Sequence, residues 1–323
     1  MRFLAVFFTI CSAVLLSTCS PAYSSHVTGS PYNRAYDSYS GMTHTGARHN
    51  PAPIPAAART ISRPSASAQA PYRAYNMPQE PAPRPNCAAV CVIDPNTGQI
   101  FYSYNADTKR QVASTQKIVT ALCVCDEGDL DSMVTIHPSD CKAPPIRLNL
   151  KPGTEYRKSE LLKAMLIGSF NDVALSLARD TAGSVDAFVE RMNKRARRMK
   201  MHNTHFANPN GLPAEQYSTA HDMARAACYA YHNRTIREYI NIPTYDFVKA
   251  DGRIRKMNST NRLLRTHPWV HGMKTGYTNA AGKCLISCGS YNGRSVIVVV
   301  LGSTSSKIWG ESLKYLKWAL NIA

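Results

Sequence analysis

Three short strings along the chain combine residue types that could carry out nucleophilic catalysis. They are Ser114-Thr-Gln-Lys117, Ser169-Phe-Asn171 and Lys274-Thr-Gly276, in that order. A serine hydroxyl is a weak nucleophile until a base takes its proton. Serine and lysine three residues apart share one face of a helix, so the amine of Lys117 can reach the hydroxyl of Ser114. The first string therefore predicts a nucleophile and its base.

The other two strings supply what such a pair needs. A lysine acts as a base only when it is neutral, and burial together with a nearby positive charge such as Lys274 lowers its pKa. Ser169 and Asn171 offer a hydroxyl and an amide that can relay a proton and hold a substrate. Gly276 would let a substrate strand approach a sheet edge closely. Each string alone is weak evidence, since Ser-x-x-Lys should occur about once by chance in such a chain. Their order is more informative, because the same trio marks penicillin-binding proteins and class A β-lactamases.

Longer stretches around these strings extend the likeness. From about Ala88 to Leu320 the chain resembles the low-molecular-mass penicillin-binding proteins, the serine-type D-alanyl-D-alanine carboxypeptidases. The stretches that carry the resemblance are Ala113–Thr120, Asn208–Leu212, Tyr217–Ala220 and Ala281–Leu285. It implies an α/β (α+β) fold of the β-lactamase/transpeptidase type, an antiparallel sheet flanked by helices with a mostly helical subdomain. It also implies removal of the terminal D-alanine from peptidoglycan stem peptides through an acyl-enzyme, acylation by β-lactams, and no cofactor.

The resemblance assigns a role to each site residue. The catalytic residues would be Ser114, Lys117 and Ser169, with Ser169 as the proton relay. The substrate-binding residues would be Asn171, Lys274, Thr275, Gly276 and Tyr277. The backbone amides of Ser114 and Tyr277 would form the oxyanion hole.

One departure from the family concerns the substrate carboxylate. Many relatives place an arginine just after the last strand, where it helps to grip that group. Here the place falls on Ile308 or Trp309, and Lys307 is the nearest cation. A lysine is a point charge without the bidentate fork of arginine. The residues therefore leave endopeptidase action on the same chemistry open beside carboxypeptidase action.

Two further functions could use the same fold. A β-lactamase needs a carboxylate that activates the deacylating water, and neither Glu190 nor Glu215 lies in a matching motif. A non-catalytic wall-binding protein would not need the catalytic residue types, all of which are present. The sequence favours the carboxypeptidase over both.

Hydrophobic patterning predicts the elements that position these strings. Two hairpins, at residues 88–104 and 283–302, frame the folded part. Helical patterns cover residues 114–124, 159–167, 171–180 and 184–200, another starts near Ser218, and the last covers 306–323. Because strands lie at both ends, we expect the first and last hairpins to pair in one sheet without threading.

The N-terminal residues predict export. Residues 1–22 have one positive charge, a short apolar run and small residues, as a signal peptide does, and Cys19 could mark a lipoprotein signal. Residues 23–86 are rich in Pro, Ala and Ser and predict a disordered linker. The catalytic domain would then span 87–323, without a second domain or a C-terminal anchor. We expect the protein in the periplasm or cell envelope, free or tethered to the membrane at its N-terminus through Cys19.

Charge and cysteine content bear on partners. The net charge is +17, and in an exported protein this favours an acidic envelope surface over nucleic acid.

All ten cysteines except Cys11 and Cys19 lie in the folded part, where disulfides or buried thiols are predicted. A metal site is not predicted, since no histidine pair with ligand spacing accompanies them. The spacing of Cys87/Cys91 and of Cys284/Cys288 predicts that each pair shares one strand face.

Overall fold

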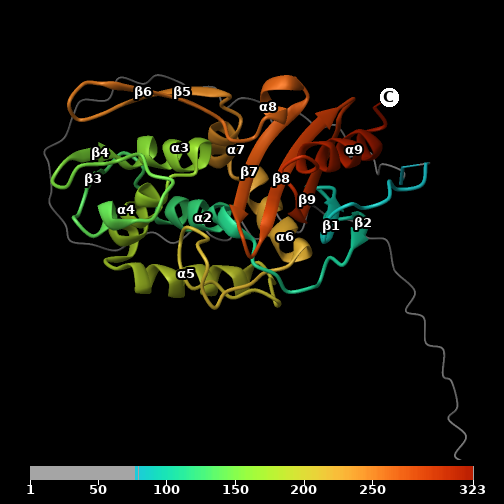
Figure 1. The fold of residues 1–323 in the computed structure, drawn as a ribbon, viewed down its shortest axis with the longest axis horizontal. Helices are drawn as coiled ribbons and strands as arrows, with labels where there is room; N and C mark the ends of the chain where they lie inside the picture. Colours follow the sequence, from blue (N-terminus) through green and yellow to red (C-terminus); the bar gives the residue numbers. More distant parts are fainter. Residues whose placement is uncertain (1–76, 79, 323) are drawn as a thin grey trace, which may run out of the picture.

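The computed structural model describes residues 77–78 and 80–322, and its centre is one antiparallel sheet (Figure 1). The strand order is β2-β1-β9-β8-β7. The strands are β1 (Ala89–Ile93), β2 (Ile100–Tyr104), β7 (Val270–Thr278), β8 (Gly282–Tyr291) and β9 (Arg294–Ser303). β1 pairs with β9, so that Val90 lies opposite Val300. The expected pairing of the first and last hairpins is confirmed.

Most of the helices lie between β2 and β7. They are α2 (Lys117–Glu127), α3 (Lys158–Gly168), α4 (Asn171–Ala182), α5 (Val185–Arg198), α6 (Ala220–His232), α7 (Arg234–Ile240) and the short α8 (Leu263–Thr266), with α9 (Ile308–Leu320) after β9. Every helix that the apolar spacing predicted is present, with ends shifted by a few residues. The first one differs at its start, where Ala113–Gln116 forms a 3₁₀ turn, η1, before α2 begins.

The sheet is covered on both faces, which explains why its central strands read as continuous apolar runs. Val90 and Val298 belong to a core that includes α9 residues such as Leu316. Their neighbours Cys91 and Val299 belong to the larger core formed with α2 and α6. The result is a three-layer arrangement, with α9 on one face of the sheet and the helical part of the molecule on the other (Figure 1).

Two small hairpins were not predicted. They are β3 (Met133–Thr135) with β4 (Glu155–Arg157), and β5 (Thr244–Val248) with β6 (Ile254–Asn258). Few of their side chains are buried, so their sequences lack the regular apolar alternation of a half-buried strand. The string Lys274-Thr-Gly276 lies inside β7. These predicted substrate-binding residues are thus held on the edge strand of the central sheet.

Residues just before Cys87 pack against α9. The hydroxyl of Tyr315 donates to the carbonyl of Pro83 at 2.9 Å, and the indole N–H of Trp318 donates to that of Glu80 at 2.8 Å. Ordered contacts therefore begin upstream of the predicted domain start at Cys87, which stays a prediction. The signal region, Cys19 and most of the predicted linker lie outside the described residues. Within the described part of the chain, no helix is long and apolar enough to span a bilayer.

All eight cysteines in the described residues are free thiols. Cys284 and Cys288 lie in the same core, as their spacing predicted. The prediction for Cys87 and Cys91 is wrong, because Cys87 packs on the α9 side whereas Cys91 lies in the opposite core. The reason is that β1 begins only at Ala89, so strand alternation does not extend to Cys87.

Candidate active site

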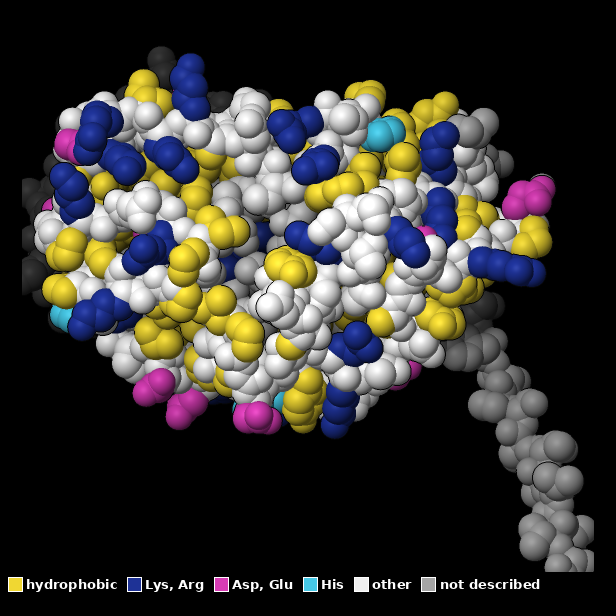
Figure 2. All heavy atoms as spheres, viewed as in Figure 1, with side chains coloured by type: hydrophobic (Ala, Val, Ile, Leu, Met, Phe, Trp, Pro, Cys, Tyr) yellow, Lys and Arg dark blue, Asp and Glu magenta, His cyan; other side chains and the backbone are white. Residues whose placement is uncertain are grey.

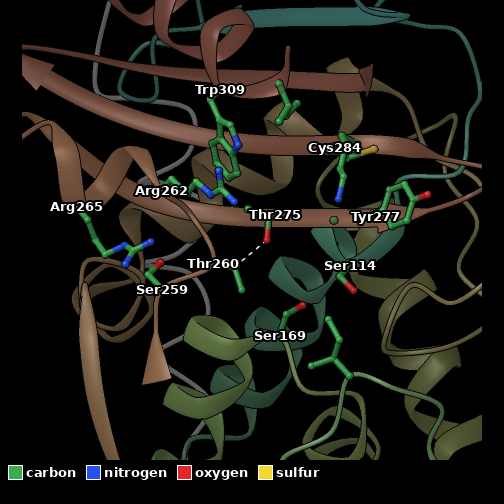
Figure 3. Close-up of a pocket in the computed structure, with 14 residues that line it drawn as sticks. Ser114, Ser169, Ser259, Thr260, Arg262, Arg265, Thr275, Tyr277, Cys284 and Trp309 are labelled. Carbon is green, nitrogen blue, oxygen red and sulfur yellow. Dashed lines mark hydrogen bonds between the residues drawn. The ribbon is translucent and has the colours of Figure 1, made fainter. Parts of the chain in front are cut away.

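A cleft of about 420 Å³ opens between β7 and the helical part of the molecule (Figure 3). Two walls face each other across it. The helical wall includes Ser114, Ile146 and Ser169, and the sheet wall includes Thr275, Gly276 and Tyr277. Among the described residues that line the cleft, none is Asp or Glu, whereas Arg262, Arg265 and Lys283 are cationic. Figure 2 shows Lys and Arg side chains spread over the face of the molecule on which β7 and α2 meet.

Ser114 is presented by a tight turn at the start of η1. The residue before it, Ala113, has a φ of 49°, a left-handed value that is uncommon outside glycine. The hydroxyl of Thr115 donates to the carbonyl of Val112 at 2.6 Å and closes the turn. A strained residue next to a nucleophile is typical of positions that are fixed for function.

Two glycines pack against this turn from outside. A Cβ on Gly276 would lie 2.9 Å from the amide nitrogen of Ser114. A Cβ on Gly211 would lie 2.2 Å from the carbonyl oxygen of Ala113. Real Cβ atoms do not approach so closely, so the turn fits only because both positions lack a side chain. The close approach that requires Gly276 is thus to the protein's own backbone, whereas the sequence pointed to a substrate strand.

The side chain of Lys117 is fully buried behind Ser114. Its Nζ has three oxygen neighbours, at 2.9, 2.9 and 2.6 Å: the hydroxyl of Ser114, the side-chain carbonyl of Asn171 and the main-chain carbonyl of Asn210. Burial holds the pKa of Lys117 well below its usual value, and the charge of Lys274 lowers it further. The structure therefore brings nucleophile and base into hydrogen-bond contact and favours the neutral amine that a general base requires.

The two residues of the second string occupy different depths. Ser169, at the end of α3, lines the cleft with a φ of 64°. Within the described residues, its hydroxyl makes no hydrogen bond, so its role as a proton relay stays a prediction. Asn171 is buried and bridges Lys117 to the carbonyls of Pro144 and Pro145, at 3.1 and 2.9 Å from its Nδ2. It fixes the base from behind, and direct contact with a substrate stays a prediction.

The third string forms the sheet wall. Lys274 is fully buried, its Nζ donates to the carbonyl of Thr275 at 3.0 Å, and burial lowers its pKa to about 7. The hydroxyl of Thr275 donates to that of Thr260 at 2.7 Å (Figure 3). Tyr277 is 54% exposed, and Nζ of Lys283 lies 4.0 Å from its ring centroid. The exposed ring lines the cleft.

The residue types and their spacing did not predict the role of the loop at residues 208–211. The Asn210 carbonyl accepts from both Lys117 and Ser114, the latter at 3.1 Å. Side chains of α2 and η1 hold this loop: Gln116 donates to the Asn208 carbonyl at 2.5 Å, and Thr120 donates to the Pro209 carbonyl at 2.6 Å. The stretch was visible in the sequence as part of the resemblance, but a main-chain acceptor leaves no residue type to recognise.

Asp172 is a second residue without an assigned role. Its carboxylate is buried and accepts hydrogen bonds from the amides of Leu148, Asn149 and Leu150 at 2.9, 2.8 and 3.3 Å. These bonds fix the loop that carries Ile146 into the cleft. The carboxylate also opposes the lowering of the Lys117 pKa.

Comparison with known proteins agrees with this geometry. The profile of the D-alanyl-D-alanine carboxypeptidase family matches residues 76–305. D-alanyl-D-alanine carboxypeptidase DacF of Bacillus subtilis is 33% identical over 224 residues, which are 67% of this chain and 57% of DacF. D-alanyl-D-alanine endopeptidase of Pseudomonas aeruginosa is 32% identical over 215 residues, 65% of this chain and 69% of that protein. The structure of the Streptomyces K15 DD-transpeptidase is similar with a TM-score of 0.70 and 28% identity, covering 75% of this chain and 100% of that one.

The fold and the serine–lysine site together place the chain in the class of penicillin-binding proteins. The chain belongs to the D-alanyl-D-alanine carboxypeptidase family. The predicted family and fold class are confirmed. The chain spans a little over half of the length of DacF.

Proposed function

We propose that the protein is a serine-type D-alanyl-D-alanine carboxypeptidase that removes the terminal D-alanine from peptidoglycan stem peptides. The observation that carries this proposal is the 2.9 Å contact between Nζ of Lys117 and Oγ of Ser114, made by a fully buried lysine behind a serine that lines an open cleft. A serine hydroxyl in contact with a buried amine of lowered pKa is an activated nucleophile, because the neutral amine can take its proton. The family to which the chain belongs supplies the substrate class.

Acylation begins when neutral Lys117 accepts the proton of Ser114. Oγ then bonds to the carbonyl carbon of the penultimate D-alanine, and the amides of Ser114 and Tyr277 donate to the oxyanion. An oxyanion-hole donor of this kind contributes about 3 kcal/mol to transition-state stabilisation. The peptide C–N bond breaks as protonated Lys117 returns its proton to the departing amine, with Ser169 as the proposed relay. D-alanine leaves, and the shortened peptide stays on Ser114 as an ester.

Deacylation repeats these steps with water. Lys117 takes a proton from the water, whose oxygen bonds to the ester carbonyl carbon. The ester bond to Oγ then breaks, and the proton on Lys117 returns to Ser114. The shortened peptide is released with a new carboxylate, and the enzyme is restored. A penicillin would acylate Ser114 by the first half of this sequence, through opening of its lactam C–N bond.

The cleft lining bears on the β-lactamase alternative. None of the described lining residues is Asp or Glu, and Glu190 and Glu215 are both exposed outside it. A carboxylate that activates water for rapid release of a penicilloyl group therefore has no counterpart at the site. We expect a long-lived adduct with penicillin.

Mass spectrometry of the purified protein after exposure to penicillin tests the proposal. We expect one adduct of the mass of the penicillin on Ser114 and none on Ser114→Ala. A release assay for free D-alanine on a pentapeptide ending in D-Ala-D-Ala then measures hydrolysis. Absence of both signals in a folded protein would favour a non-catalytic wall-binding role. Release only from cross-linked dimers would favour an endopeptidase, as the Pseudomonas relative is named.

We also propose that the protein acts outside the cytoplasm, in the periplasm or cell envelope. The signal-like residues at the start of the chain support this, as does the location of the substrate class. Labelling of cells with a fatty-acid analogue tests the tether: incorporation that Cys19→Ser abolishes would establish a lipid anchor at Cys19. Fractionation with the cytoplasm would contradict export itself.

A further inference from the structure

Among the residues that the structure describes, the cleft lacks the carboxylate-binding arginine of many relatives, but other cations line it. Lys307, the nearest cation in the sequence, is exposed, donates to Oδ1 of Asn86 at 3.1 Å and does not line the cleft. Trp309, at one of the two aligned positions, does line it. Two arginines from a different element line the same cleft: Arg262, which directly precedes α8, and Arg265, which lies within it.

Arg262 is placed against Trp309. Its Cζ lies 5.6 Å from the centre of the Trp309 ring (Figure 3). Stacking of a guanidinium on an aromatic ring orients its plane and leaves the N–H groups at its edge available. Within the described residues, no carboxylate or other acceptor pairs with the Arg262 side chain. The cation is therefore oriented but not neutralised.

The backbone at Arg262 is fixed by its neighbour. Asn261 is 1% exposed, and its Oδ1 accepts from the amide of Leu263 at 3.1 Å while its Nδ2 donates to the hydroxyl of Ser287 at 3.4 Å. Because the backbone of Arg262 is fixed and its guanidinium is stacked, the side chain loses little conformational entropy when it binds an anion. Figure 3 shows Arg262 on the Thr275 side of the cleft, where the hydroxyls of Thr275 and Thr260 meet.

We propose that Arg262, held on the Trp309 ring, binds the terminal carboxylate of the substrate and takes over the task of the family's missing arginine. The proposal rests on the proposed function, since it concerns which groups recognise the peptide that Ser114 attacks. A planar guanidinium with a free edge suits a carboxylate, which accepts two parallel N–H bonds. The hydroxyl of Thr260, which accepts from Thr275, would supply a further donor at the same end of the cleft.

A pair of matched substrates tests this role. One is a pentapeptide ending in D-Ala-D-Ala with a free carboxylate, and the other is its C-terminal amide. We expect Arg262→Ala to raise KM for the carboxylate about 10- to 100-fold, with a smaller change in kcat, and to leave the amide unaffected. Arg262→Lys should recover part of the preference for the carboxylate. Arg255→Ala, which removes an exposed arginine outside the cleft on β6, should leave both substrates unchanged.

Two further variants separate the roles of the neighbours. Trp309→Phe keeps an aromatic platform and should keep most of the carboxylate preference, whereas Trp309→Ala should lose it.

An unchanged ratio of carboxylate to amide turnover in folded Arg262→Ala would overturn the proposal, and so would collapse of that ratio in Arg265→Ala alone. Acylation of Ser114 by a penicillin methyl ester, which lacks the free carboxylate, is the separate readout for the proposed function. If wild type and Arg262→Ala both form that adduct while the ratio stays unchanged, only the Arg262 assignment fails.

Discussion

The helical wall of the cleft has its reactive groups in contact before any substrate is present, whereas the opposite side leaves its cations open. Lys117 already touches Ser114 and is held by Asn171 and the Asn210 carbonyl. Arg262 and Arg265 line the same cleft, are exposed, and pair with no carboxylate in the described residues. Hydrogen bonds are thus satisfied within the protein at the site of the proposed proton transfer, whereas cations stay unpaired at the proposed site of a charged substrate.

This difference follows from the physics of each task. General-base catalysis requires a neutral amine at a fixed distance, so burial and internal hydrogen bonds help it. Recognition of an anion requires a cation whose hydrogen-bonding edge is free, so internal pairing would weaken it. Substitutions on the two sides should therefore affect different quantities, rate on one and affinity on the other.

The largest effect is expected on the helical wall. Lys117→Ala removes the base and should slow acylation of Ser114 by penicillin about 10³-fold or more, because positioned general bases contribute 10²- to 10⁴-fold. Stopped-flow measurement of acylation, with circular dichroism as a check of folding, tests this. Lys256→Ala, an exposed lysine of β6, is the control and should acylate at the normal rate. Normal acylation in Lys117→Ala would mean that another group is the base.

A pH profile measures how the two sides depend on each other. Burial lowers the pKa of Lys274 to about 7, so its positive charge is lost as the pH rises through neutrality. That charge helps to keep Lys117 neutral, and the family resemblance predicts that it also acts on the substrate. We expect kcat/KM to fall about tenfold per pH unit well above this pKa, since kcat/KM reports groups of the free enzyme. In Lys274→Arg the residual activity should lack this alkaline decrease, and a decrease that persists would assign it to another group.

The contact between the walls can be tested at Gly276. Gly276→Ala would place a Cβ 2.9 Å from the amide of Ser114, so β7 or the turn at Ala113 must shift. We expect about a tenfold loss of acylation rate and about 1–3 kcal/mol of destabilisation, as for other overpacked sites. Gly310→Ala in α9, where a Cβ would meet nothing within 4 Å, is the matched control and should be neutral or slightly stabilising. Equal acylation rates and equal stabilities of Gly276→Ala and Gly310→Ala would show that the close contact at Gly276 does not hold the turn at Ala113 in place.

The smallest effect is expected at Lys283, which lines the cleft beside Tyr277. Lys283→Gln removes the cation that lies 4.0 Å from the Tyr277 ring centroid. Exposed cation–π contacts contribute about 0.5–1 kcal/mol, which corresponds to a two- to fivefold change. We expect KM to rise within that range while kcat stays constant in steady-state kinetics. A large fall in kcat would place Lys283 with the reactive groups and remove the distinction between the walls.

The sequence was most informative where side-chain type and spacing decide the structure. The separation of three between Ser114 and Lys117 predicted their contact, and the apolar runs of β1 and β9 predicted a shared sheet. The Asn210 carbonyl could not be predicted, because any residue type presents a main-chain oxygen. Arg262 could not be placed either, since its position depends on how α8 packs beside a ring contributed by α9. Such contacts arise from tertiary packing and not from local pattern.

The pairing of β1 with β9 has a consequence for how the chain acquires its structure. Val90 and Val300 face each other across more than two hundred residues of intervening chain, so a large loop must close before the central sheet exists. Contacts of such sequence separation slow folding, and unpaired apolar strands expose edges that favour aggregation in the meantime. During synthesis, which starts at the N-terminus, the five residues of β1 cannot pair with β9 until nearly all of the domain has been made. Chaperones that hold unfolded chains would therefore find an apolar strand with a free edge in β1.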